Sequence, residues 1–240
     1  MNEVIIEKMS SMKLFGMQQS FQTILEGGQF NNLTNDELIN MLIQAEWEDR
    51  QTRKINRYIK SAKFRYQACI EEIDHHANRN LDKTQLLRLA DCSFITQKKN
   101  ILITGPTGVG KSFIISALGH QACVRGYKAT YLNTQKLFTR LRMSKADGTY
   151  LKEIDKFERV DLIIIDDFGL QQLDNQNRMA LLEIIEDRYE RKSTIISSQL
   201  PVNKWYDIIG EGTVADAILD RLINGSFRIE LKGESLRKRK

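Results

Sequence analysis

The spacing of apolar residues changes once along the chain and divides the sequence into a helical part and a mixed part. From Glu3 to Asn78 the apolar residues recur with the spacing of amphipathic helices. From about Lys99 onward, short apolar runs alternate with helical stretches, which is typical of strands joined by helices. We therefore predict a small all-helical N-terminal domain, followed by an α/β domain with a parallel sheet flanked by helices.

The longest predicted helix has a start signal, because Thr34 is a favourable N-cap and Glu37 completes a capping box. The pattern lets this helix run from Asn35 to beyond Tyr66. Its second half carries an apolar stripe formed by Ile55, Ile59, Ala62 and Tyr66. The opposite face is basic and consists of Arg50, Arg53, Arg57 and Lys60.

Five short apolar runs in the mixed part predict strands that are buried on both faces. They are Asn100–Thr104, Lys128–Leu132, Asp161–Asp166, Thr194–Ser198 and Phe227–Leu231. The expected organisation is a helical domain over residues 1–80, a linker over 81–99, the α/β domain over 100–232 and a basic C-terminal tail over 233–240.

The loop after the first predicted strand matches the whole phosphate-binding pattern G-x-x-x-x-G-K-[ST] and precedes a helix predicted over Ser112–Arg125. Its glycines let successive N–H groups face phosphate oxygens at the positive end of that helix. Lys111 is placed to neutralise the β- and γ-phosphates, and the Ser112 hydroxyl to reach Mg²⁺. We predict binding of ATP with magnesium through Gly105, Pro106, Thr107, Gly108, Val109, Gly110, Lys111, Ser112 and Phe113.

A second part of this site is predicted where a buried strand ends in Asp166 and Asp167. Two unpaired carboxylates at a buried strand end are costly unless they face a cation or a polar site. Asp166 is the expected partner of Mg²⁺, through water or Ser112, and Asp167 the expected general base for the attacking water. The alternative is that both acids only cap the following loop.

The strand Thr194–Ser198 should lie beside the strand that ends in the two acids. Its polar end, Ser198 and Gln199, is placed to bring an amide near the γ-phosphate or the attacking water. An ordinary transition from strand to loop explains the same residues.

Composition describes an ordinary soluble protein, with 41% hydrophobic and 28% charged residues. No apolar run approaches the roughly 20 residues of a membrane span, and the N-terminus has no signal-peptide core. Three cysteines without a Cys-x-x-Cys spacing favour reduced thiols in a cytoplasmic protein.

The net charge of +5 is unevenly distributed. The stretch from Arg50 to Arg65 holds seven basic residues and no acidic one, and the chain ends in the basic run Arg237–Lys240. Such clusters favour a polyanionic partner, although a charged run is also the ordinary form of a solvated face.

Together these motifs resemble the AAA+ ATPases, in the branch of the initiator proteins and the DnaC helicase loader. Within it they are most similar to the IstB-type ATPases that assist insertion-sequence transposases. The phosphate loop and the two acids are shared across the branch. The segments similar to the IstB pattern are Glu46–Arg57, Ser61–Arg65, Ser198–Pro201, Asp220–Leu222 and Gly233–Arg237.

The resemblance implies that Gln199 holds the sensor-1 position and that Arg221 is an arginine finger, which reaches the γ-phosphate of a neighbouring subunit. An arginine supplied in trans makes hydrolysis depend on assembly. The alternative is a surface arginine on the helix predicted over Val214–Ile223. The expected catalytic residues are Lys111, Asp167, Gln199 and Arg221.

Two departures from the wider AAA+ pattern point to slow, assembly-dependent hydrolysis. Asp167 replaces the glutamate of most AAA+ proteins, as in the DnaC and IstB branch. Only 19 residues follow Arg221, which is too few for the usual helical lid with its second sensor arginine. ATP is then expected to act as an assembly signal that hydrolysis resets.

Two basic surfaces are candidates for DNA contact. The first is the basic face of the long helix, which suits phosphates and carries no evident base-reading set. The second, in a region that faces nucleic acid in related assemblies, consists of Lys136, Arg140, Arg142 and Lys145. A solvated face remains the alternative for both.

The preferred hypothesis is a transposition helper, which forms a ring or helical homo-oligomer on duplex DNA and stimulates a partner transposase. The first alternative is a DnaC-like loader that grips a replicative helicase and holds single-stranded DNA. The second is a P-loop kinase for a small molecule, which fits less well because no substrate-pocket signature or arginine-rich lid is evident.

Overall fold

The computed structural model describes residues 2–28, 33–75 and 79–236. It divides the chain into two compact units, Met1–Arg57 and Tyr58–Lys240. In the described residues, no helix has the length and apolar character needed to cross a membrane.

The N-terminal unit consists of α1 (Asn2–Ser11), α2 (Phe15–Glu26) and most of α3 (Asn35–Ala62). The predicted capping box is confirmed, since the Thr34 N–H donates to Glu37 Oε2 at 2.8 Å and the Glu37 N–H donates to Thr34 Oγ1 at 3.3 Å. A second carboxylate, that of the buried Glu46, accepts hydrogen bonds from the N–H groups of Gly16 and Met17. It therefore ties the amino end of α2 to α3.

The helix predicted to run beyond Tyr66 ends at Ala62, and the prediction of its end was wrong. Lys63 adopts a left-handed backbone with φ of 57°, which interrupts the helical hydrogen bonds. The reason lies in the packing of the next aromatic residues. Phe64 contacts Gly119 of α6, and the Tyr66 ring lies 6.0 Å from that of Phe113.

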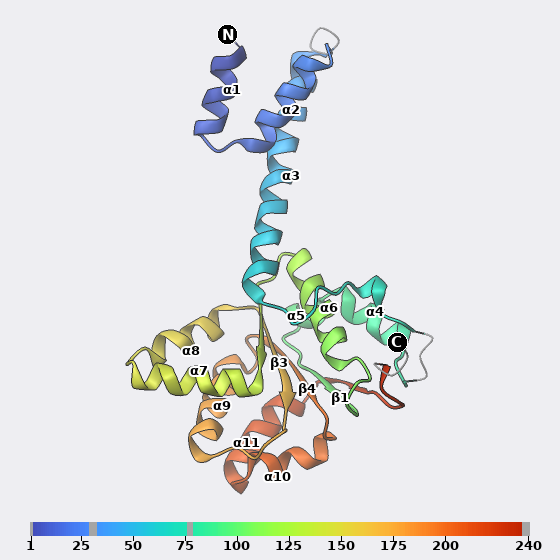
Figure 1. The fold of residues 1–240 in the computed structure, drawn as a ribbon, viewed down its shortest axis with the longest axis vertical. Coiled ribbons are helices and arrows are strands. Elements are labelled where there is room, and N and C mark those ends of the chain that lie inside the picture. Colours follow the sequence, from blue (N-terminus) through green and yellow to red (C-terminus); the bar gives the residue numbers. More distant parts are fainter. Residues whose placement is uncertain (1, 29–32, 76–78, 237–240) are drawn as a thin grey trace. The chain divides into compact units, whose positions relative to one another are not determined.

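The second unit is built on a parallel sheet of five strands in the order β2-β3-β4-β1-β5. Its strands are β1 (Ile101–Thr104), β2 (Ala129–Asn133), β3 (Leu162–Phe168), β4 (Ser193–Ser198) and β5 (Phe227–Glu230). All five predicted strands are confirmed, with ends displaced by one or two residues. Isoleucine and leucine dominate them because both faces of the sheet are covered (Figure 1).

The helices of this unit form two layers around the sheet (Figure 1). They are η2 (Ile70–Glu72), α4 (Lys83–Ala90), α5 (Ser93–Thr96), α6 (Lys111–Val124), α7 (Thr134–Ala146), α8 (Tyr150–Arg159), α9 (Asn175–Arg188), η3 (Val202–Lys204), α10 (Trp205–Ile209) and α11 (Gly212–Ile223). Alternate residues of a strand enter different apolar clusters. Ile103 packs with the helices up to α6, and Leu102 with those from α7 onward.

The segment expected as a linker, residues 81–99, holds α4 and α5 in the structure. Leu86, Leu89 and Phe94 are almost completely buried and belong to the same apolar cluster as β1. The division between compact units falls at Arg57 and Tyr58, not within this segment. The polar residues of α4 face outward, whereas Leu86 and Leu89 face the core.

Arg188 at the end of α9 joins several elements of the second unit. Its guanidinium is 2% exposed and donates to the carbonyl oxygens of Phe157, Val160 and Ser193 at 2.6, 3.0 and 2.5 Å. Burial lowers its pKa to about 9, so the group is still charged at neutral pH. These carbonyls sit where α8, β3 and β4 meet, and few other donors can reach them.

Replacing Arg188 by methionine is expected to lower the free energy of unfolding by about 3 kcal/mol, because buried carbonyls lose their donor. Urea unfolding followed by circular dichroism measures the change. The matched control is Arg191→Met, since Arg191 is exposed and its ion pair with Glu158 is long, at 3.9 Å. Equal stability of the two variants would contradict this role of Arg188.

Candidate nucleotide-binding site

The phosphate loop, Gly105–Ser112, connects the carboxyl end of β1 to the amino end of α6. Gly108 and Gly110 have φ of 87° and 95°, in the left-handed region where a side chain is strained. A Cβ at Gly108 would also collide with Ser235, because the end of the described chain closes over the loop. The Leu236 N–H donates to Gly108 O at 3.0 Å.

Lys111 is the first residue of α6 and is 6% exposed. Its ammonium group donates to the carbonyl oxygens of Gly105 and Pro106 at 2.7 and 2.8 Å. The Lys111 side chain is therefore folded back onto the loop. Its ammonium group lies on the concave side of the loop backbone, where a phosphate would bind. An anion entering the loop would meet this charge together with the positive end of α6.

Asp166 is completely buried near the carboxyl end of β3. Its oxygens accept hydrogen bonds from the hydroxyl groups of Tyr131 on β2 and Ser197 on β4, and from the Asp167 N–H at 3.0 Å. Burial, and then the hydrogen bond to this carboxylate, raises the pKa of the Tyr131 hydroxyl, which stays a neutral donor. Two neighbouring strands thus hold Asp166 in place.

Asp167 has a left-handed backbone with φ of 59°, at an irregularity in the pairing of β3 with β4. Such a bulge redirects a side chain, here toward the edge of the sheet that carries the phosphate loop. Asp167 Oδ2 accepts hydrogen bonds from Arg65 Nη1 at 3.2 Å and from Asn133 Nδ2 at 3.1 Å. The carboxylate is 21% exposed and lines a cavity, as a general base must.

Gln199 follows β4 and contacts the phosphate loop directly, since the Thr107 hydroxyl donates to Gln199 Oε1 at 2.7 Å. Ser198 is fully buried and instead donates to the carbonyl oxygen of Phe168 at 2.7 Å. Of the two polar residues predicted at this strand end, only Gln199 lines the cavity.

The cavity beside the phosphate loop has a volume of about 580 Å³. Of the residues predicted for catalysis or for metal binding, it brings together Lys111, Ser112, Asp167 and Gln199. Phe113 also lines it, whereas Asp166 lies behind its wall. The other lining residues are Arg65, Tyr66, Glu72, Asp74, Arg79, Thr107, Gly108, Gly110, Leu170 and Leu236.

Two arginines of this cavity were not predicted as part of the site. The sequence marks Arg65 only as a member of the basic stretch and of the IstB-like segment Ser61–Arg65. Arg79 is 4% exposed and donates to Val109 O at 3.0 Å and to Asp74 O at 2.6 Å, beside Gly110. Neither lies in a helix or strand, and nothing in its position along the sequence places it near the phosphate loop.

The site also has the chemistry that a magnesium ion requires. Mg²⁺ prefers oxygen ligands and takes few of them from the protein, leaving the rest to phosphates and water. The Ser112 hydroxyl and the Asp166 carboxylate supply such oxygens. The described residues contain no group of three or more His, Cys, Asp or Glu side chains suited to a metal. A guanidinium already lies 3.6 Å from Asp166 Oδ2, so the acidic pair attracts positive charge.

Arg221 lies on α11, away from the phosphate loop of its own chain. It forms an ion pair with Glu186 of α9 at 2.7 Å, donates to Ala217 O and stacks over the Tyr189 ring. The cavity beside it is lined by Asn100 and Asn224, which precede β1 and β5. Arg221 is therefore at the amino edge of the parallel sheet, whereas the phosphate loop is at the carboxyl edge.

The basic face of α3 is partly balanced by its own acids. Arg50 pairs with Glu46 at 2.6 Å, and Arg53 pairs with Asp49 at 2.6 Å, one turn upstream. No ion pair of Arg57 or Lys60 is found in the part of the chain that the structure describes. All four predicted residues are exposed.

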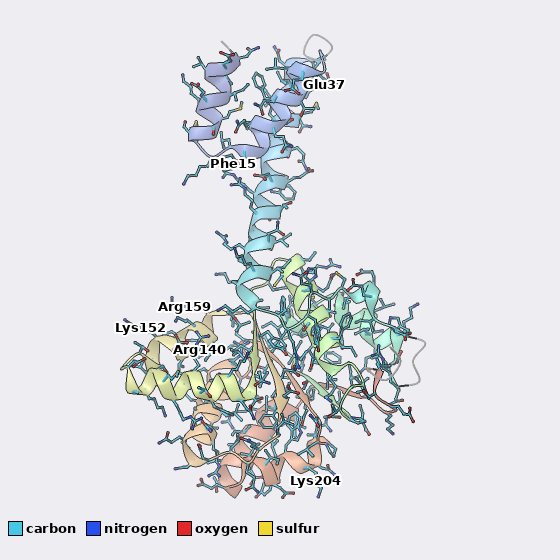
Figure 2. All side chains as sticks on the ribbon, viewed as in Figure 1. Phe15, Glu37, Arg140, Lys152, Arg159 and Lys204 are labelled. Carbon is cyan, nitrogen blue, oxygen red and sulfur yellow. The ribbon has the colours of Figure 1, made fainter. Side chains whose placement is uncertain are left out.

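The second basic set lies on α7 as predicted, and its members are exposed. Arg140 forms an ion pair with Glu153 of α8 and lies over the Phe157 ring (Figure 2). Lys145 Nζ lies 4.6 Å from the centroid of the Tyr150 ring, whereas Lys136 and Arg142 are exposed and form no ion pair within the described part of the chain. The C-terminal run Arg237–Lys240 falls outside the described residues.

Comparison with known proteins agrees with this architecture. Residues 7–240 match the family model described as IstB-like ATP binding protein. A protein of Sinorhizobium fredii described as an insertion sequence ATP-binding protein is 42% identical over 233 residues, which cover 97% of this chain and 95% of the relative.

Two solved structures share the fold at low sequence identity. The structure of DnaI has a TM-score of 0.59 and 19% identity, covering 70% of this chain and 90% of its own. The structure of the DnaC helicase loader has a TM-score of 0.56 and 22% identity, covering 71% of this chain and all of its own (100%).

The parallel sheet, its phosphate loop and the paired acids define an ATP-binding protein with the AAA+ fold of the DnaC and DnaA proteins. The match to the family model extends from residue 7 and so includes the N-terminal helices. The chain belongs to the family of IstB-like ATP binding proteins.

Proposed function

We propose that this protein is an ATP-dependent DNA-binding regulator of transposition, which oligomerises on duplex DNA and recruits and stimulates a partner transposase. The observation that carries the proposal is the family match over residues 7–240, which includes the helical unit as well as the sheet. The relative from Sinorhizobium fredii, described as an insertion sequence ATP-binding protein, is aligned over nearly its whole length.

The nucleotide site supports an ATPase activity. Lys111 and the amino end of α6 bind the phosphates, and Gln199 stands beside Thr107 to orient the reacting groups. Asp167 accepts a proton from the attacking water. When bound, magnesium neutralises phosphate charge next to Ser112 and Asp166.

The position of Arg221 supports an assembly in which each site is completed by a neighbour. Within one chain this arginine is at the wrong edge of the sheet to contact its own nucleotide. An arginine that faces a nucleotide across an interface between two subunits stabilises the negative charge of the transition state only when the subunits are assembled. Hydrolysis would then be slow in the monomer and faster in an assembly on DNA.

The exposed cations of α3 and α7 support DNA binding through the phosphate backbone. The strongest candidates are Arg57, Lys60, Lys136 and Arg142, because their side chains are exposed and form no ion pair with another described residue. The other predicted cations contact acidic or aromatic partners that they would have to leave, which lowers their contribution to the free energy of DNA binding. They are Arg50, Arg53, Arg140 and Lys145.

Duplex DNA together with ATP and Mg²⁺ is expected to convert the protein into large particles, which ADP does not support. Electron microscopy and sedimentation of the same samples measure their formation. Arg57→Glu combined with Lys60→Glu should abolish the particles, because repulsion from phosphates replaces attraction. The matched control is Lys204→Glu, which reverses an exposed charge outside both basic sets (Figure 2). Particles that are indifferent to nucleotide would contradict the proposal.

The fold likeness to the DnaC helicase loader supports a second candidate function, a loader that binds single-stranded DNA and a replicative helicase. The same measurements distinguish it, since a loader would assemble on single strands or helicase and leave duplex DNA unbound. A protein that stays monomeric with ATP and either form of DNA would instead favour a P-loop kinase.

A further inference from the structure

Arg65 is a cation of the nucleotide site that comes from outside the sheet. It lies three residues after the end of α3 and directly precedes Tyr66, whose ring packs beside Phe113 at the start of α6. Its guanidinium is 3.2 Å from Asp167 Oδ2 and 3.6 Å from Asp166 Oδ2, and the side chain remains 42% exposed. The same side chain lines the cavity that holds Lys111 and Ser112.

This contact places positive charge on the two carboxylates in the absence of nucleotide. A fully buried carboxylate is costly without a compensating charge or hydrogen bonds. Tyr131 and Ser197 supply neutral donors to Asp166, but they do not balance the charge of two adjacent acids. Arg65 supplies that charge from a side chain that can move, because more than a third of it is exposed.

A divalent ion next to Asp166 would compete with this guanidinium. Both are cations that gain by approaching the same oxygens, and the two cannot share them without repulsion. The ion pair between Arg65 and the two aspartates therefore opposes binding of the divalent ion. This ion pair must break when the divalent ion binds.

We propose that Arg65 is an exchangeable counter-ion of the Asp166–Asp167 pair, which occupies the acidic pair in the nucleotide-free protein and is released when magnesium and ATP bind together. The proposal deepens the nucleotide site of the proposed function and does not depend on DNA, assembly or hydrolysis. It makes Lys63–Tyr66 a segment whose conformation reports whether the metal-bound nucleotide is present.

The proposal predicts a change in how strongly ATP binding depends on magnesium. Without Mg²⁺, Arg65→Ala exposes ATP to two unbalanced carboxylates and weakens binding. With Mg²⁺, the same variant has no pair to break and binds as tightly as the wild type or more tightly. The ratio of the Kd in EDTA to the Kd in Mg²⁺ should therefore rise by about 5-fold, the value of one half-exposed ion pair.

Isothermal titration calorimetry with ATP, in EDTA and in Mg²⁺, measures this ratio in the absence of DNA. Arg65→Lys should keep a ratio near that of the wild type, because the charge is retained. Lys204→Ala is the control, since it removes one exposed cation that lies outside both basic sets and does not line the cavity. An unchanged ratio in Arg65→Ala would overturn the proposal. A fall in the ratio would do so as well, because it would mean that Arg65 binds the phosphates themselves.

Hydrogen exchange of the wild-type protein gives a second test that needs no variant. Amides of Lys63–Tyr66 should exchange faster with ATP and Mg²⁺ than with ATP in EDTA, because only the metal releases Arg65. Equal protection in the two conditions would overturn the proposal. If DNA-dependent assembly fails while both tests succeed, the proposed function is wrong and the role of Arg65 stands.

Discussion

Replacing Arg221 by alanine is expected to leave ATP binding intact and to lower DNA-stimulated hydrolysis by about 10³-fold, the lower range for an arginine finger. The reason is positional. Arg221 pairs with Glu186 at the amino edge of the sheet, whereas the phosphate loop of the same chain begins at the carboxyl edge. The arginine can meet a nucleotide only across an interface between two subunits.

Subunit mixing provides the sharpest measurement. Lys111→Ala lacks a functional phosphate loop but keeps Arg221, and Arg221→Ala has the opposite defect. A mixture should recover part of the hydrolysis rate, because some interfaces then combine an intact loop with an intact arginine. Phosphate release measured at several mixing ratios follows this recovery.

The control variant for this prediction is Glu186→Gln. It removes the acidic partner of Arg221 and leaves the guanidinium in place, so hydrolysis should persist. A mixture that stays inactive, or an Arg221→Ala protein that hydrolyses ATP at the wild-type rate, would contradict a role in trans. In that case Arg221 would be a structural residue that links α9 to α11.

Asp167→Asn is expected to lower hydrolysis by about 10²–10⁴-fold, the usual contribution of a general base, while ATP binding is retained. Asparagine accepts a left-handed backbone such as the φ of 59° at Asp167. Its amide oxygen can still accept hydrogen bonds from Arg65 and Asn133. The substitution therefore removes charge and basicity and preserves the fold of the site.

Single-turnover phosphate release and ATP titration separate the two effects. Particles formed on DNA with ATP should also persist longer in this variant, since hydrolysis no longer resets them. Asp166→Asn is the contrasting variant, because a buried amide would face the hydroxyl donors Tyr131 and Ser197 and lower stability as well. Wild-type hydrolysis by Asp167→Asn would exclude Asp167 as the base.

Local sequence patterns determined the architecture of the sheet domain. The central strands β1 and β3 contain runs of isoleucine and leucine, because a parallel sheet that is covered on both faces buries side chains on either side. The phosphate loop could also be predicted from a local pattern. Its glycines, Lys111 and Ser112 lie within eight consecutive residues, and phosphate binding depends on that spacing. The capping box of α3 is also local, spanning four residues.

Other features depend on residues that are far apart in the chain, and only the tertiary structure decided them. Arg65 and Asp167 are 102 positions apart, and Arg79 and Val109 are 30 apart. No periodicity relates such residues, so their role in the cavity was invisible in the sequence. The end of α3 at Ala62 has the same origin, because Phe64 and Tyr66 pack against α6.

The sequence by itself therefore determined which strands form, where the predicted phosphate loop lies and which family the motifs resemble. The tertiary structure decided what surrounds those motifs: the donors that hold Asp166, the guanidinium on Asp167 and the remote position of Arg221. The physical reason is that strand formation and phosphate binding follow from neighbouring residues. The charge balance of a buried site instead follows from whichever side chains the fold brings together.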